Sequence, residues 1–137
     1  MAEPRAFLSF DYDNNLTSRN LFAGQAKSDS PTSFIVEDWS SKSVLPEEEW
    51  EELISKKISN CHMLIVLVGR SMGSAYGVAA EIAMAKDKNV PIFGVYVDNA
   101  TSSSTLPSGL ARNRVIGWNW NDIGAAIDQM MGEGKNA

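Results

Sequence analysis

The stretch His62–Gly69, HMLIVLVG, is a continuous apolar run of strand length. Such runs are typical of central strands in parallel sheets, where both faces are covered. The next stretch, Ser74–Lys86, reads SAYGVAAEIAMAK and predicts a helix of small and apolar residues, with Ser74 as its N-cap. A further apolar run, Val90–Asp98, predicts another strand. Strand, helix and strand in this order predict a parallel βαβ unit.

The same alternation extends to both sides of this unit. Upstream, Arg5–Phe10 and Ser33–Asp38 predict two strands, and Arg114–Trp118 predicts one more downstream. Three further helices are predicted, over Asn14–Lys27, from Pro46 as first residue to Cys61, and from about Asn119 to Met130. The sequence therefore predicts an α/β fold with a five-stranded parallel sheet and helices on both faces.

Length and composition favour one globular domain. The 137 residues are 44% hydrophobic, which supplies a core without disulfides. We expect a single domain over residues 1–137, with an ordered core of about 5–131 and a frayed tail, GEGKNA. The net charge of −5 argues against a nucleic-acid-binding surface or a basic membrane anchor.

The compartment is suggested by the ends of the chain and by its one cysteine. The start, MAEPRAFLSF, lacks the long apolar run of a signal peptide, and the longest apolar runs are too short to span a bilayer. Cys61 cannot form an internal disulfide, which fits a reducing compartment. We therefore expect a cytoplasmic protein.

Several common α/β chemistries are disfavoured by the loops. The first predicted strand runs into FDYDNN, which has no glycine to cradle a phosphate, so neither a P-loop nor a dinucleotide fingerprint is present. The third strand ends in VGRS without the acid of a phosphoacceptor domain. We expect no metal site, because the single histidine, His62, reads as a partly buried strand residue and Cys61 as a small core residue.

Glu81 is the residue that raises a functional question. It is the one carboxylate in the middle of an otherwise apolar helix, and no basic residue lies three or four positions away. Two interpretations are open. Glu81 is either a partly exposed acid that reaches water or a distant arginine, or a carboxylate that lines a cleft to bind sugar hydroxyls or stabilise a cation.

An ordered set of motifs resembles one known family. The opening AFLSFDYDN, the second strand and loop SFIVEDWSS, the central segment LIVLVGRSMGSAYGVAAEIAMAKDKNVPIFGVYVD and the closing RVIGWNWNDI resemble TIR domains, in particular the bacterial TIR-like proteins of Thoeris anti-phage systems. The resemblance covers about Arg5 to Met130. It implies the flavodoxin-like fold of TIR domains.

The resemblance also implies an activity. TIR enzymes cleave the bond between nicotinamide and ribose in NAD, and Thoeris members make a cyclic or otherwise modified ADP-ribose signal for a separate effector protein. Glu81 corresponds to the catalytic glutamate by its place in the third helix. It would hold the ribose hydroxyls and oppose the positive charge left when nicotinamide departs. NAD is then the substrate, and no metal or other cofactor is expected.

Further site residues follow from this expectation. Ser74 and Gly77 are small and would let the sugar approach Glu81, and Tyr76 stands near a position where the family often has tryptophan. The other expected substrate-binding residues follow the first two strands: Phe10, Asp11, Tyr12 and Trp39. Trp39 could equally pack on the sheet edge, Phe10 could belong to the core, and Asp11 could cap the next helix.

Other functions remain open at this stage. A non-catalytic TIR-like module would bind protein partners and leave NAD intact. A glycosyl-transfer enzyme resembling nucleoside deoxyribosyltransferases would use the same carboxylate on free nucleosides. For the TIR-type enzyme we expect self-assembly through TIR–TIR contacts and no nucleic acid or membrane partner.

Overall fold

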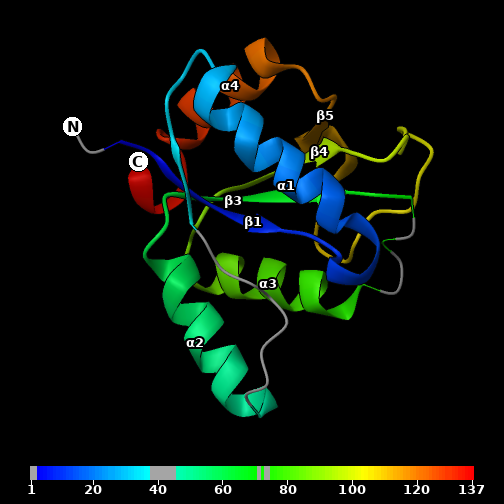
Figure 1. Cartoon of the computed structure of the whole chain (residues 1–137). Coiled ribbons are helices and arrows are strands. Elements are labelled where there is room, and N and C mark those ends of the chain that lie inside the picture. Colours follow the sequence, from blue (N-terminus) through cyan, green and yellow to red (C-terminus); the bar gives the residue numbers. More distant parts are fainter. Residues whose placement is uncertain (1–2, 38–45, 71, 73–74) are drawn as a thin grey trace.

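A computed structural model describes residues 3–37, 46–70, 72 and 75–137. Five parallel strands form one sheet in the order β2-β1-β3-β4-β5 (Figure 1). The strands are β1 (Arg5–Ser9), β2 (Ile35–Glu37), β3 (Met63–Val68), β4 (Ile92–Tyr96) and β5 (Val115–Ile116). This arrangement confirms the predicted α/β fold and its five-stranded parallel sheet.

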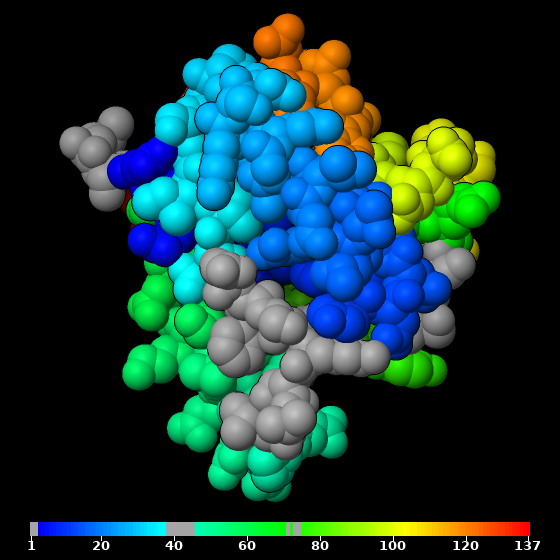
Figure 2. All heavy atoms as spheres, in the orientation of Figure 1, coloured from blue at the N-terminus to red at the C-terminus, as the bar shows by residue number. Residues whose placement is uncertain are grey.

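Helices cover both faces of the sheet. They are α1 (Tyr12–Ser28), α2 (Glu47–Ser59), α3 (Tyr76–Asp87) and α4 (Trp120–Met130), with short 3₁₀ turns η2 (Arg112–Arg114) and η3 (Gly134–Asn136). Figure 1 shows α1 and α4 on one face and α2 and α3 on the other, and in Figure 2 the side chains of α1 cover the sheet from the front. Within the described ranges, no helix combines the length and the apolar character needed to cross a membrane.

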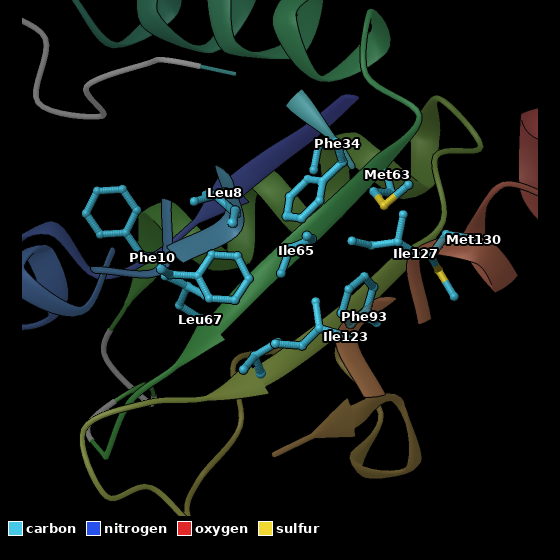
Figure 3. Close-up of a cluster of buried hydrophobic side chains, with 14 of the residues drawn as sticks. Leu8, Phe10, Phe34, Met63, Ile65, Leu67, Phe93, Ile123, Ile127 and Met130 are labelled. Atoms are coloured by element: carbon cyan, nitrogen blue, oxygen red, sulfur yellow. The ribbon is translucent and has the colours of Figure 1, made fainter. Parts of the chain in front are cut away.

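The alternation of side chains along each strand produces two separate cores. Met63, Ile65 and Leu67 of β3 pack with residues of α1 and α4, whereas Leu64 and Val66 pack under α2 and α3. Figure 3 shows the first of these cores around Ile65 and Leu67. Every β3 side chain is buried, as expected for a central parallel strand.

Cys61 and His62 lie just before β3, and both make contacts that belong to the fold. Cys61 is fully buried, and burial raises the pKa of its thiol to about 12. His62 is partly buried, and its Nδ1 accepts a hydrogen bond of 3.0 Å from the backbone N–H of Arg5. Cys61 is therefore the core residue that the sequence predicted.

Several helix boundaries differ from those expected. α1 begins at Tyr12, two residues early, because the carboxylate of Asp11 caps it and accepts from the N–H of Asp13. Pro46 is the N-cap of α2 and not its first helical residue. α3 begins at Tyr76 after Ala75, and the proposed cap Ser74 lies outside the described residues.

The end of the chain is more ordered than expected. Instead of fraying, Gly134–Asn136 form a turn that lies against the amino end of the sheet. The backbone N–H of Lys135 donates to Asn89, and the side chain of Asn136 donates 2.7 Å to the carbonyl of His62. The expectation of a loose tail was wrong because these polar contacts come from residues far apart in sequence.

Candidate active site

A pocket of about 290 Å³ lies at the carboxyl edge of the sheet, between the end of β1 and the start of α3. One wall of the pocket consists of the residues that follow β1 and begin α1. Another consists of the first two turns of α3. The described lining residues are Phe10, Asp11, Tyr12, Asp13, Trp50, Ala75, Tyr76, Gly77, Val78 and Glu81. In a sheet with this strand order, the connections from β1 and β3 run to opposite faces, and the resulting crevice is a usual place for ligands.

Glu81 lies on the buried stripe of α3. Val78, Glu81, Ile82 and Ala85 share this face at helical spacing, and Glu81 is only 2% exposed. The interpretation of Glu81 as a partly exposed acid is therefore wrong. The carboxylate is carried into the α2/α3 core and ends at the pocket.

Ser9 supplies the hydrogen bond to this carboxylate. Its hydroxyl donates to Oε1 of Glu81 over 2.6 Å, across 72 positions of sequence. Ser9 is the last residue of β1, and the strand alternation puts it on the same face as Phe7, under α3. No other hydrogen bond or ion pair of Glu81 occurs within the part of the chain that the structure describes.

Burial dominates the protonation of Glu81. Desolvation raises the pKa of this carboxyl from 4.5 to about 8, against the opposing effect of the Ser9 hydrogen bond. A carboxyl with such a pKa takes up and releases its proton near neutral pH. Strong perturbation by burial in a pocket is a known property of functional carboxyls.

The residues after β1 combine structural and pocket-lining positions. Phe10 is buried in the α1/α4 core and also lines the pocket, with its ring centroid 6.1 Å from that of Tyr12. Asp11 lines the pocket while it caps α1 and accepts from the side chain of Asn14. Phe10 is therefore both a core residue and part of the pocket wall, and Asp11 is both a helix cap and part of that wall.

The start of α3 presents a different surface. Tyr76 is 81% exposed at the pocket, and a Cβ added to Gly77 would meet no heavy atom of the described residues within 4 Å. Packing against the described part of the chain therefore gives no reason for glycine at position 77. Trp39 and Ser74, the other two predicted site residues, lie outside the described residues.

Three residues at the pocket were not anticipated as part of it. Asp13 and Trp50 line it. Ser9 lies behind it, as the partner of Glu81. Ser9 had a detectable signal, because it is the one polar residue in the run AFLSF and shares the strand parity of Phe7.

A polar cluster joins α1 to Asp98, which follows β4. Asn15 has non-helical backbone angles that kink α1, and its buried amide donates to the carboxylate of Asp98. Ser18 donates 2.5 Å to the second oxygen of Asp98. A Cβ on Gly69 would lie 2.5 Å from the Asn15 amide nitrogen, so glycine leaves the space that this amide occupies.

The family model of the Thoeris protein ThsB TIR-like domain matches residues 7–102. The chain belongs to this ThsB TIR-like family. Membership indicates a role in anti-phage defence. The matched segment runs from β1 past β4 and includes Ser9 and all the described residues of the pocket.

Outside the ThsB family, similar proteins are found among solved structures. A search of curated proteins finds no significant match. Among solved structures, a 3-dehydroquinate dehydratase-like protein from Bifidobacterium longum is similar, with 17% sequence identity and a TM-score of 0.47. That alignment covers 97% of this chain and 100% of the other.

Proposed function

We propose that this protein cleaves the bond between nicotinamide and ribose in NAD, with Glu81 as the catalytic residue. The observation that carries the proposal is a buried carboxylate at the wall of a pocket between β1 and α3. In the reaction, the bond from ribose C1′ to the ring nitrogen breaks, and nicotinamide leaves as a neutral molecule with both bonding electrons. The ribosyl cation that remains is stabilised by the carboxylate until water or another nucleophile adds to C1′.

The composition of the pocket suits the nicotinamide end of NAD. Its described lining contains three acids, Asp11, Asp13 and Glu81, four aromatic side chains and no lysine or arginine. Bound nicotinamide is a cationic ring, and aromatic faces and carboxylates both attract such a ring. The diphosphate of NAD carries negative charge and fits this acidic lining poorly. We therefore place the nicotinamide and its ribose in the pocket.

The size of the pocket supports the same placement. Its volume of about 290 Å³ is near the lower end of the range of roughly 300–1,000 Å³ common for small-molecule sites. One ring and one sugar suit this space better than a whole dinucleotide does. The small residue Gly77 keeps the space beside Glu81 open, and Tyr76 offers an exposed ring at the rim.

Binding would also change the charge of Glu81. A pKa of about 8 leaves most of this carboxyl protonated at pH 7 in the free protein. A cationic ring placed beside it favours the carboxylate form, because opposite charges lower the pKa of an acid. The substrate would thus help to produce the carboxylate that its own cleavage requires.

The defence role places this reaction in a signalling context. We propose that the product, a linear, cyclic or transferred ADP-ribose, acts on a separate effector protein, and that self-assembly supports activity. The family membership supports the defence role. The nucleophile that reaches C1′ decides which product forms.

The test is NAD turnover by matched variants. Wild type, Glu81→Gln and Asp87→Asn are incubated at high protein concentration with NAD, with and without lysate from phage-infected cells, and the products are resolved by mass spectrometry. Asp87→Asn is the control, since it changes an exposed acid on the same helix outside the pocket. We expect nicotinamide release by wild type and Asp87→Asn, and a loss of at least 100-fold in Glu81→Gln, in line with the loss of one stabilising group.

Other outcomes select other functions. Turnover retained in folded Glu81→Gln would remove Glu81 from the mechanism. NAD that survives every condition would favour a partner-binding module, and consumption of free nucleosides in place of NAD would indicate glycosyl transfer between nucleosides.

A further inference from the structure

Among the described residues, Ser9 and Glu81 form a buried polar pair on the α2/α3 side of the sheet. Ser9 is fully buried, Glu81 is 2% exposed, and their 2.6 Å hydrogen bond joins the last residue of β1 to the middle of α3. The hydrophobic cluster on this face of the sheet includes Phe7, Val66, Val68 and Ile82, whose side chains offer no polar partner. A buried hydroxyl without a partner is costly, so each member of the pair depends on the other.

We infer that Ser9 is a positioning residue for Glu81: its hydroxyl fixes Oε1 of the carboxylate and leaves Oε2 for the molecule that enters the pocket. This inference deepens the proposed function and rests on it for its catalytic consequence. Within the described ranges, no hydrogen bond occupies Oε2. Without the Ser9 hydrogen bond, the glutamate side chain would be ordered only when the ligand binds. The entropy cost of that ordering would then weaken binding.

The strand and the helix both hold Ser9 in place. β1 lies between β2 and β3 in the sheet, and Ser9 pairs in register with Val66. A donor on such a strand has little freedom to move, unlike one on a loop. The short serine side chain fits inside the core, and its hydroxyl still reaches Glu81 on α3. The geometry therefore gives Glu81 a fixed orientation before any ligand arrives.

The same hydrogen bond acts on the charge of Glu81. A hydroxyl that donates to a carboxylate stabilises the charged form, and this opposes the effect of burial. The other charged groups that share the pocket are Asp11 and Asp13, which follow β1, while α2 contributes the uncharged Trp50. Among the described pocket residues none carries a positive charge, so Ser9 is the group that favours ionisation.

The test compares two serines that each donate to a carboxylate. Ser9→Ala removes the donor to Glu81, and Ser18→Ala is the matched control, since Ser18 is also buried and donates 2.5 Å to Asp98 outside the pocket. The pKa of Glu81 is measured by carbon NMR of its side-chain carboxyl, assigned with Glu81→Gln. This measurement requires no enzymatic activity. The pH dependence of NAD cleavage is then measured for the same variants.

In Ser9→Ala we expect the pKa of Glu81 to rise by about one unit or more, because a hydrogen bond to a charged group is lost. Cleavage at pH 7 should fall about tenfold, with part of the deficit recovered at pH 9, where the carboxyl ionises again. Ser18→Ala should change neither. Ser9→Thr, which keeps the hydroxyl, should restore the pKa of wild type if it folds.

An unchanged pKa of Glu81 in folded Ser9→Ala would overturn the inference. If the pKa rises but no variant and no wild type cleaves NAD, the pairing of Ser9 and Glu81 stands and the proposed function fails. A rise in pKa with cleavage unchanged at every pH would show that Ser9 does not position the catalytic group, and would also overturn the inference.

Discussion

Glu81 is an ionisable residue whose charged form is disfavoured by burial in the folded protein. Its one described donor is the Ser9 hydroxyl, and apolar side chains fill the space below α3. The folded protein therefore holds the proton up to about pH 8, while an unfolded chain releases it near 4.5. Between these values the unfolded state binds fewer protons than the folded state, so stability falls as the pH rises.

Glu81→Gln should remove this pH dependence. From pH 5 to pH 9, wild type should lose on the order of 3–5 kcal/mol of unfolding free energy relative to the variant. Urea unfolding at pH 5, 7 and 9 measures the difference. Wild type and Glu81→Gln should diverge mainly above pH 5, with the variant the more stable at pH 9. Parallel profiles would mean that Glu81 ionises as a solvated acid and that its burial has little effect on its charge.

At the scale of the element, the first turn of α3 carries a glycine that packing does not require. Gly77 in α3 and Gly24 in α1 both lie in helices, and a Cβ at either position would meet none of the described atoms within 4 Å. Alanine at such positions stabilises a helix by about 0.5–1 kcal/mol. The two glycines differ in one respect, because only Gly77 lines the pocket.

Gly77→Ala and Gly24→Ala therefore separate stability from ligand access. Both variants should unfold at slightly higher urea concentration than wild type. Only Gly77→Ala should raise the KM for NAD, by about tenfold for a methyl group that takes up space beside Glu81, in line with the cost of a misfit of that size. Equal KM values in both variants would place the sugar away from Gly77.

At the kink of α1, the side-chain amide of Asn15 lies against Gly69. A Cβ at position 69 would meet Oδ1 of Asn15 at 2.6 Å, and the buried amide would have to leave Asp98. Gly69→Ala should destabilise the fold by about 1–3 kcal/mol, the usual cost of an unsatisfied buried polar group. In an Asn15→Ala background the same change should cost clearly less, as a double-mutant cycle in urea would show. Additive costs would exclude the contact.

At the scale of the whole molecule, the fold was well predicted by the sequence. Apolar runs of strand length alternate with helical stretches, and β3 is apolar throughout because helices cover both of its faces. The resemblance to TIR domains led us to expect Glu81, Phe10 and Tyr76 in one site. The pocket brings these three residues together.

The details that escaped prediction are contacts between distant parts of the chain. The register that puts Ser9 under Glu81 spans 72 positions, and the link from Asn15 to Asp98 spans 83. Neither contact can be predicted from the spacing of residues within one helix or strand, because each depends on the position of a helix along the sheet. The start of α3 was also misplaced, since its small residues give weak boundary signals.

The two cores of the sheet contribute unequally to the candidate site. The site draws Ser9, Glu81 and Val78 from the face under α2 and α3, whereas the opposite face contributes mainly Phe10 and its neighbour Tyr12. Residues such as Ile65, Phe93 and Ile127 pack on that opposite face, away from the carboxyl group. An engineer who wishes to make the protein more heat-resistant can therefore redesign the part of the α1/α4 core around Ile65, Phe93 and Ile127, which does not line the pocket.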